Sequence, residues 1–326
     1  MKTVALVVTL ALGLLTAPLA TEGQQAKKVH RIGVLGAGSP SGYAHLVGAF
    51  RQGLRDLGYV EGKNLVIEYR WAEGNYDRLA DLAAELVRLK LELIVTHGTP
   101  GTLAAKRATT TIPIVMAVSG DAVATGLVAS IARPGGNITG SSFLFPELTA
   151  KRLELLKEAV PRVTRVAVLL NPGNPANGPA LKAMEAAAKS LKLELLQFQV
   201  RGPDEFDGAF STMVTRRVEG LSVIDDFMLV AHGRQIAELA LKRGIPGIGF
   251  REYAEAGGLM AYAVDFPEFW RRAAVFVDKI LKGAKPSDLP VEQPTKFEFV
   301  VNLNTAKALG LTIPPSVLVR AERVIQ

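Results

Sequence analysis

Short runs of Val, Ile and Leu alternate along the chain with longer segments in which apolar residues recur every three to four positions. The first run covers residues 31–35, and the segment behind it carries Leu46, Phe50 and Leu54 on one helical face. Later runs of the same kind cover residues 65–69, 93–96, 114–116, 165–169 and 221–224. Such strands, separated by amphipathic helices, are typical of parallel sheets that are buried on both faces. The pattern therefore predicts an α/β fold.

The two halves of the chain resemble each other. Residues 31–35 read Arg-Ile-Gly-Val-Leu, and residues 165–169 read Arg-Val-Ala-Val-Leu. The pair Ile112-Pro113 returns as Ile245-Pro246 at nearly the same offset. A repeat of this size predicts two Rossmann-like lobes, each a parallel sheet flanked by helices, with a cleft between them.

Residues 1–25 have the layout of a secretory signal peptide. Met1-Lys2 supplies positive charge, residues 4–15 form an apolar run, and small residues lead into a polar stretch. The run is shorter than the roughly 18 to 20 residues that span a bilayer, and Pro18 interrupts it. The chain contains no Cys, so a lipid anchor attached through Cys is excluded. We expect an exported, periplasmic protein, with an uncleaved membrane anchor as the alternative.

The net charge of +7 does not by itself indicate an acidic partner. Lys and Arg are scattered, and the longest basic runs are pairs without interleaved aromatic residues, which argues against a nucleic-acid partner. Without Cys there is no thiolate metal site, and the four His residues lack the i, i+4 spacing of a zinc helix. We therefore predict no metal and no cofactor.

Ligands of open parallel sheets bind beyond the carboxyl ends of the strands, so the loops that follow the predicted strands are the candidate site. These loops are rich in small residues, hydroxyls, amides and carboxylates, which suits a small polar or zwitterionic ligand. Helix N-termini in the first lobe are available to a carboxylate. The candidate ligand-binding residues are Gly38, Ser39, Thr96, Gly98, Thr99 and Asp121 in the first lobe, and Asn171, Asn174, Asp225, Asp226 and Glu252 in the second.

Some of these residues also have a purely structural interpretation. The segment from Gly36 to Gly42 resembles a dinucleotide-binding fingerprint only loosely, because its third Gly falls one place late, and a plain strand-to-helix turn explains it. Asp225 and Asp226 either hold an ammonium group or cap the helix expected near Met228.

The same choice applies to other loops. Arg251 and Glu252 either grip a ligand or form a solvated ion pair. The Asn-Pro pairs that begin at Asn171 and Asn174 either contact a ligand or serve as turns. A set of aromatic residues either lines an apolar pocket or belongs to the core. The set is Tyr43, Trp71, Tyr76, Phe227, Tyr253 and Phe266.

Several segments carry a family resemblance. The most specific is Gly-Leu-Arg-Asp-Leu-Gly-Tyr-Val-Glu-Gly-Lys-Asn-Leu at residues 53–65. The others are residues 68–74, 126–137, 278–286, 289–294 and 305–314. Together with the N-terminal signal, they resemble the ABC-transporter substrate-binding protein family that includes tryptophan- and tyrosine-type binders. One departure is Asp121-Ala122-Val123, where family members commonly read Asp-Pro-Val.

The resemblance implies a periplasmic type I binding protein that is not an enzyme. Its two lobes, joined by a three-stranded hinge, would close on a small molecule such as an aromatic amino acid. The protein would then deliver it to a membrane permease and its ATPase, which are its only contact with the membrane. On this basis we expect residues 28–142 and about 266–295 to form lobe 1, and residues 146–264 and about 296–326 to form lobe 2.

In the mechanism that we expect, neutral donors of Gly98, Thr99 and the Gly38-Ser39 loop first bind the ligand carboxylate. Closure then brings Asn174, Asp225 and Glu252 against the ligand, with an acid placed for its ammonium group.

Two other functions remain open on the sequence. One is a ligand sensor that reports to a membrane receptor, and the other is an exported α/β hydrolase using His97 with Asp225 or Glu252. The hydrolase interpretation lacks a nucleophile motif.

Overall fold

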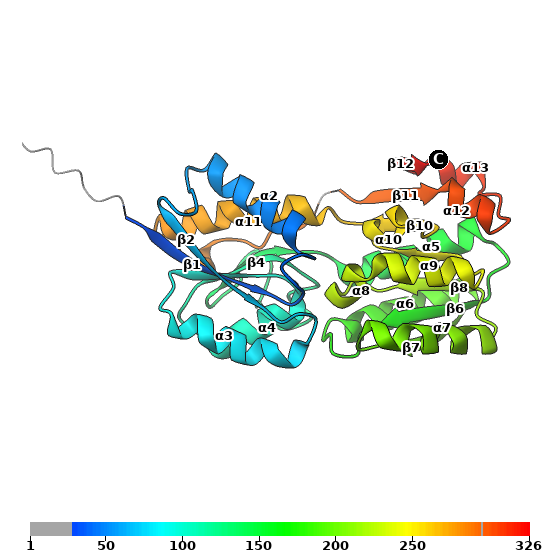
Figure 1. Ribbon diagram of the computed structural model, residues 1–326, viewed down its shortest axis with the longest axis horizontal. Coiled ribbons are helices and arrows are strands. Elements are labelled where there is room, and N and C mark those ends of the chain that lie inside the picture. Colours follow the sequence, from blue (N-terminus) through cyan, green and yellow to red (C-terminus); the bar gives the residue numbers. More distant parts are fainter. Residues whose placement is uncertain (1–27, 295) are drawn as a thin grey trace, which may run out of the picture.

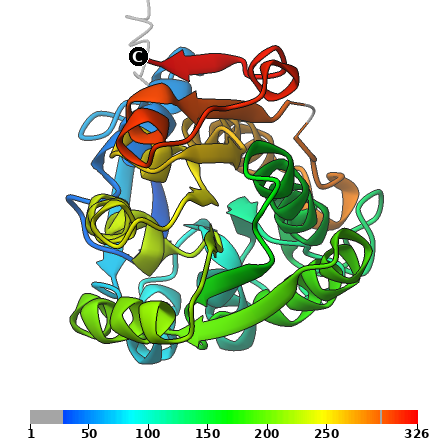
Figure 2. The same cartoon turned by 90° about the vertical axis from the view of Figure 1, so that its right-hand side faces the viewer.

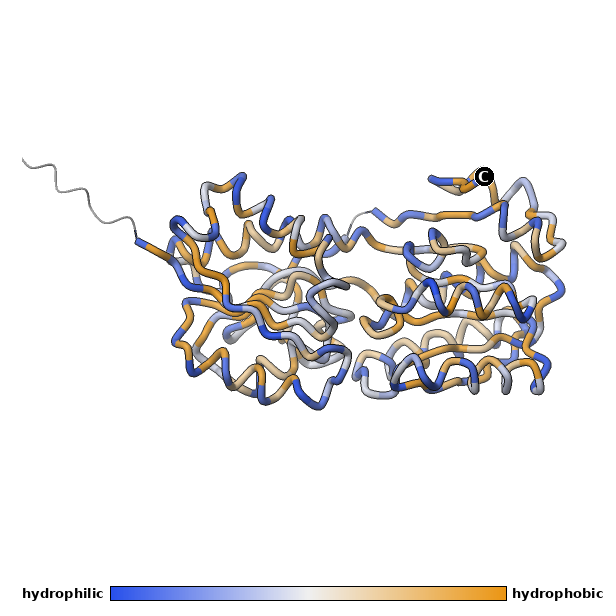
Figure 3. Tube along the Cα trace, viewed as in Figure 1, coloured by the Kyte–Doolittle hydropathy of each residue, from blue (hydrophilic) through white to orange (hydrophobic). Residues whose placement is uncertain are grey.

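The computed structural model describes residues 28–294 and 296–326, so the predicted signal peptide lies outside the described residues. Two α/β lobes lie side by side, each built around its own sheet (Figure 1). The sheet of lobe 1 has the strand order β2-β1-β3-β4-β5, and the sheet of lobe 2 has the order β12-β11-β10-β9-β8-β6-β7. Apolar positions follow the strands through both lobes (Figure 3), which confirms the predicted fold class.

Lobe 1 is a parallel sheet whose central strands are fully buried. Its strands are β1 (His30–Gly36), β2 (Leu65–Trp71), β3 (Leu93–Thr96), β4 (Ile114–Ser119) and β5 (Ile138–Ser142). Its early helices are α2 (Ala44–Asp56), η1 (Tyr76–Arg78), α3 (Leu79–Arg88) and α4 (Gly98–Ala108). Leu46, Phe50 and Leu54 form the buried face of α2, as their spacing predicts.

Lobe 2 repeats this order with more strands, and helices cover both faces of its sheet (Figure 2). Its strands are β6 (Arg165–Leu170), β7 (Glu194–Gln199), β8 (Gly220–Val223), β9 (Gly247–Gly249), β10 (Met260–Ala263), β11 (Glu298–Asn302) and β12 (Arg323–Ile325). Its helices are α5 (Phe145–Ala159), α6 (Asn177–Leu191), η2 (Pro203–Glu205), α7 (Phe206–Thr215), α8 (Phe227–Ala231), α9 (Gly233–Lys242), α10 (Arg251–Glu255), α12 (Leu303–Ala308) and α13 (Pro315–Leu318).

The sheet of lobe 2 departs from the predicted parallel arrangement at one strand pair, because β11 runs antiparallel to β10. The path of the chain explains the reversal. The chain leaves the carboxyl end of β10, which faces lobe 1, and forms α11 (Phe266–Leu281) and η3 (Pro286–Asp288) on lobe 1. It then returns to lobe 2 from the side that faces lobe 1. The returning strand therefore enters lobe 2 in the opposite direction.

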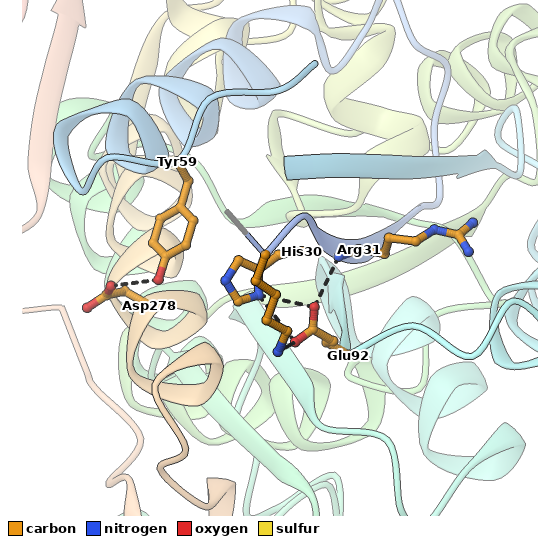
Figure 4. Close-up of polar contacts among 6 residues, drawn as sticks. His30, Arg31, Tyr59, Glu92 and Asp278 are labelled. Carbon is orange, nitrogen blue, oxygen red and sulfur yellow. Dashed lines mark hydrogen bonds and ion pairs between the residues drawn. The ribbon is translucent and has the colours of Figure 1, made fainter. Parts of the chain in front are cut away.

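Helix α11 packs on lobe 1 although it follows β10 of lobe 2, and it lies along α2 (Figure 1). Gly53 of α2 allows the close approach, since a Cβ at this position would come within 2.4 Å of the Arg271 carbonyl oxygen. The Tyr59 hydroxyl donates a buried 3.0 Å hydrogen bond to Asp278 of α11 (Figure 4). These contacts hold α11 on lobe 1.

Three segments of the described chain connect the lobes. The chain crosses first between β5 and α5, and again between β10 and α11. The third crossing lies between Glu292, which is bridged to Ser141 in lobe 1, and Phe297, whose ring stacks on Tyr262 of lobe 2 at 5.4 Å. Over residues 28–294 and 296–326, no helix combines the length and the apolar character needed to cross a membrane.

Candidate functional site

A small cavity lies between the lobes, where the strands of both sheets end. Its volume is about 20 Å³. From lobe 1 and the hinge it is lined by His97, Gly98, Thr99, Val118, Ser119, Gly120, Phe143 and Phe266. From lobe 2 it is lined by Phe145, Asn174, Ala176, Asp225, Asp226, Phe227 and Val230. This is where the carboxyl ends of parallel strands are expected to form a ligand site.

The polar part of lobe 1 is the start of α4. Strand β3 ends at Thr96, His97 is the N-cap residue, and the helix begins at Gly98 with φ +76°. The Thr99 hydroxyl lies 3.1 Å from the Ser119 hydroxyl, so the ends of β3 and β4 are joined at the cavity. Backbone N–H groups at a helix N-terminus and neighbouring hydroxyls are suitable donors for a carboxylate.

His97 is fully buried and uncharged. Burial, and next the nearby His45, hold the pKa of the imidazole well below its ordinary value. The indole N–H of Trp270 donates to His97 Nδ1 at 3.1 Å, so the single proton of the neutral ring is on Nε2. Nε2 is buried and has no hydrogen-bond partner among the described residues.

Aromatic rings surround His97. We call Tyr43, His97, Phe266 and Trp270 the aromatic cage. The imidazole lies 5.6 Å from the Tyr43 ring, 5.7 Å from Phe266 and 5.3 Å from Trp270, measured between ring centroids. Phe227 of lobe 2 enters this cage, with its centroid 3.8 Å from that of His97. Of the candidate aromatic residues, Tyr43 and Phe266 therefore belong to the cage and Phe227 enters it, whereas Tyr253 is fully buried in lobe 2.

Asp225 forms a buried ion pair at the edge of the cavity. Arg152, a fully buried residue of α5, binds both carboxylate oxygens through Nη1 at 2.5 Å and Nη2 at 3.1 Å. The guanidinium also donates to the Val223 and Tyr262 carbonyl oxygens. Two donors leave part of the acceptor capacity of the Asp225 carboxylate unused.

Asp226, by contrast, accepts four hydrogen bonds. Its Oδ1 accepts from Asn171 Nδ2 at 3.3 Å and from the Met228 N–H at 3.1 Å, which makes Asp226 the N-cap of α8. Its Oδ2 accepts from Asn174 Nδ2 at 3.0 Å and from the Tyr76 hydroxyl at 2.8 Å. Burial raises the pKa of this carboxyl, and these hydrogen bonds oppose the increase.

The bond between Tyr76 and Asp226 joins the lobes directly, because Tyr76 belongs to η1 of lobe 1. The two amides that donate to Asp226 also form turns. Asn171 Oδ1 accepts from the Gly173 N–H, and Asn174 Oδ1 accepts from the Ala176 N–H. The Asn-Pro segments thus shape the loop and position Asp226.

The structure brings five of the predicted site residues to the cavity and leaves six outside its lining. Gly98, Thr99, Asn174, Asp225 and Asp226 line it. Gly38, Ser39, Thr96, Asp121, Asn171 and Glu252 do not. Ser39 accepts from the Gly42 N–H, and Asp121 accepts from the Val123 and Ala124 N–H groups, so both shape turns.

Two of the outlying residues have other surroundings. Thr96 is fully buried at the end of β3. Burial raises the pKa of the Glu252 carboxyl at the start of α10. The possible ion pair between Arg251 and Glu252 is not formed. Arg251 instead lies 3.8 Å from Asp265 and 3.5 Å from Glu298.

A second, larger groove of about 850 Å³ lies beside the hinge, away from the strand ends of lobe 1. Both of its arginines are already paired with carboxylates of its own lining: Arg272 lies 2.6 Å from Glu292, and Arg251 lies 3.5 Å from Glu298. We therefore place the candidate site in the cleft. The described residues contain no group of three or more His, Asp or Glu side chains arranged to hold a metal ion.

The candidate residues chosen from the sequence omit Arg152 and Trp270, which position Asp225 and His97. A signal for Arg152 exists in the sequence. It occupies the same helical face as Leu148, Leu155 and Ala159, where an apolar residue is expected. A charge at such a position requires a buried partner, and Asp225 is that partner.

The chain belongs to a family of transport proteins. The family model described as ABC transporter substrate binding protein matches residues 31–325. Proteins of this family bind substrates rather than transform them, and they act outside the cytoplasm.

Individual relatives fit this assignment. A tyrosine-binding protein of Clostridioides difficile (strain R20291) is 28% identical over 263 residues, which cover 80% of this chain and 75% of that protein. The crystal structure of a Streptococcus pneumonia domain in complex with L-Trp is 27% identical, with a TM-score of 0.84, and the match covers 91% of this chain and 100% of that one.

A third comparison concerns the arrangement of the lobes. The ligand-free, open structure of a substrate-binding protein with adhesive properties from Clostridium difficile is 25% identical, and the match covers 91% of this chain and 99% of that one. Its TM-score is only 0.64. In the structure described here, the direct bond from Tyr76 to Asp226 shows that the two lobes are in contact.

Proposed function

We propose that this protein captures an aromatic amino acid between its lobes in the periplasm and delivers it to a membrane permease and its ATPase. The observation that carries the proposal is the composition of the cleft. Rings that suit an aromatic side chain lie beside a helix N-terminus and an acidic loop, which suit the two charged ends of an amino acid. A tyrosine-binding relative and an L-Trp complex support the same ligand class.

The ligand carboxylate would bind at the start of α4. Gly98 and Thr99 offer backbone N–H groups that lack partners within the helix, and Thr99 and Ser119 add hydroxyls. Gly98 adopts a positive φ, which favours glycine, and the absence of a Cβ lets an aromatic ring pack directly against its backbone. Ser39, Thr96 and Asp121 would act by shaping the neighbouring turns.

The ligand ammonium group would bind Asp225. Arg152 holds this carboxylate in a fixed, bidentate geometry, and the remaining lone pairs are available to a new donor. Asp226 would contribute its charge from a position fixed by Asn171 and Asn174. This division of roles follows from the different number of hydrogen bonds that each carboxylate already accepts.

Binding and release would proceed by movement of the lobes about the three connecting segments. Lobe 1 would comprise residues 28–142 and about 266–295, and lobe 2 residues 146–264 and about 296–326. The open form exposes both half-sites, and the ligand stabilises the closed form by contacting the two lobes at once. The permease would then recognise the closed pair of lobes.

The proposal is tested by thermal unfolding and titration calorimetry of the chain without its first 25 or so residues. The panel is L-tryptophan, L-tyrosine, L-phenylalanine, glycine and a sugar. A ligand at 100 times its Kd adds about 2.7 kcal/mol to the free energy of unfolding. Stabilisation by aromatic amino acids alone is expected, and stabilisation by none of them would refute the ligand class.

A matched pair of variants locates the site. Thr99→Val removes a hydroxyl at the cavity with little change in shape and should weaken binding about tenfold, as expected for one lost hydrogen bond to a charged group. Thr212→Val makes the same change on the exposed face of α7 and should bind like the wild type. Equal affinities of the two variants would contradict the placement. Delivery is tested by uptake of the labelled amino acid in a strain that lacks this protein.

A further inference from the structure

The side chain of Phe227 fills the aromatic part of the cleft. It is the first residue of α8 in lobe 2, and its ring lies 5.5 Å from Tyr43, 3.8 Å from His97 and 6.4 Å from Phe266 in lobe 1, measured between centroids. Lobe 1 accommodates it closely. A Cβ on Gly98 would come within 2.6 Å of the Phe227 ring, so only glycine fits beside it.

The space that remains is too small for the proposed ligand. The cavity of about 20 Å³ holds about one water molecule, whereas sites for organic ligands measure about 300 to 1,000 Å³. Separation of the lobes alone would not make room for a ligand, because the Phe227 ring would enter the aromatic cage again when the lobes closed into the arrangement described here. A ligand ring and the Phe227 ring therefore compete for one place.

Phe227 is also an imperfect partner for the cage. The proton on His97 Nε2 is a buried donor, and a phenylalanine ring offers it no conventional acceptor. A buried donor left without an acceptor is unfavourable. The cage therefore suits a ring that carries an acceptor oxygen better than it suits Phe227.

We propose that Phe227 is an intramolecular occupant of the ligand site, displaced by a phenolic ring such as that of tyrosine, whose oxygen accepts a hydrogen bond from His97 Nε2. The inference rests on the proposed function and adds the substrate class and the residue that limits affinity. Tryptophan satisfies the cage less well, because its indole N–H is only a donor. Phenylalanine provides no acceptor at all.

The position of Phe227 is compatible with such a displacement. Phe227 is half-buried rather than fully buried. It directly follows Asp226, the N-cap of α8, whose hydrogen bonds do not involve the Phe227 side chain. Helix α8 has only five residues and lies at the edge of lobe 2 that faces lobe 1 (Figure 1). Rotation of one side chain at this edge does not require the core of lobe 2 to rearrange.

The test is titration calorimetry of the mature protein with L-tyrosine, L-phenylalanine and L-tryptophan, for the wild type, Phe227→Leu and Phe227→Ala. Val214→Ala, which truncates an exposed apolar residue of α7, is the control. Circular dichroism and thermal unfolding of each variant establish that it is folded. Trp270, in contact with His97, provides a fluorescence signal for ligand entry into the cage.

We expect Phe227→Ala to bind tyrosine about tenfold more tightly than the wild type, which corresponds to about 1.4 kcal/mol, with Phe227→Leu between them. Tyrosine should bind more tightly than phenylalanine and tryptophan to all of these proteins. Unchanged or weaker binding by folded Phe227→Ala would show that Phe227 is a wall of the site and overturn the inference. Equal affinity for tyrosine and phenylalanine would overturn the role of His97. Binding of no aromatic amino acid by any of the proteins would instead refute the proposed function.

Discussion

Removal of the Tyr76 hydroxyl should weaken ligand binding by destabilising the closed arrangement of the lobes. This hydroxyl donates at 2.8 Å to Asp226 Oδ2 and joins η1 of lobe 1 to the start of α8 in lobe 2. Tyr76→Phe keeps the ring and deletes only this bond. Because the bond exists only while the lobes are together, its loss affects the closed form and leaves each separate lobe unchanged.

The size of the effect follows from the partner. A hydrogen bond to a charged group contributes about 1.5 to 3 kcal/mol, which corresponds to roughly 10- to 150-fold in an equilibrium constant. The lower end is appropriate here, since Tyr76 is only partly buried and water can replace part of the interaction in the open form. The Tyr76 bond also opposes the rise in the Asp226 pKa, so its loss leaves that buried carboxylate less well stabilised.

The assay combines titration calorimetry with stopped-flow measurement of ligand release, using L-tyrosine. We expect Kd to rise about tenfold, mainly through faster release, because the bond forms after the ligand has met an open lobe. Tyr69→Phe is the matched control, since the Tyr69 hydroxyl accepts from Arg51 within lobe 1. If Tyr76→Phe released the ligand no faster than Tyr69→Phe, this contact would play no part in closure.

Three further predictions concern single residues. Arg152→Met should lower the free energy of unfolding by about 3 to 5 kcal/mol, because it leaves the buried Asp225 carboxylate without a counter-charge. Urea denaturation should show that the double variant Arg152→Met/Asp225→Asn recovers part of this loss. Gly98→Ala should weaken tyrosine binding, because the new methyl group would project into the space that the Phe227 ring now fills and that the ligand ring would take, and because the positive φ is unfavourable for alanine; calorimetry showing wild-type affinity would contradict this. His97 should make the free energy of unfolding depend on pH. Its pKa is lower in the folded chain than the ordinary 6.5, so the unfolded chain binds a proton first as the pH falls. The free energy of unfolding therefore decreases below about pH 6.5, by up to about 1.4 kcal/mol per pH unit. His97→Gln should lack this component of the pH slope in chemical denaturation, and an identical slope would refute it.

Hydrophobic periodicity was sufficient to predict the lobes, because each strand of a buried parallel sheet and each amphipathic helix has its own local pattern. The same pattern could not predict that β11 is antiparallel, since that depends on where the chain re-enters lobe 2. The strand-end rule pointed to the loops after β3, β4, β6 and β8, and residues at these strand ends line the cavity between the lobes.

The roles of the site residues were harder to predict, because they depend on contacts between distant elements. Asp225 and Asp226 are neighbours in the sequence, yet one pairs with a helix 73 residues away and the other with a tyrosine 150 residues away. Nothing local distinguishes them. In the same way, Phe227 is an ordinary apolar residue of a short helix, and its importance arises only from the lobe that it faces.

Helix α11 follows β10 of lobe 2 but packs on lobe 1, and this arrangement affects how the chain folds. Tyr59 and Asp278, which hold this helix on lobe 1, are 219 residues apart. The first lobe therefore remains incomplete until almost the whole chain has been synthesised, with the apolar surface under α11 still uncovered. Contacts of such long range slow folding, so this chain should stay unfolded for longer than a chain of two independent domains would. If the predicted signal peptide directs export, this delay would favour recognition by the export machinery before the fold closes.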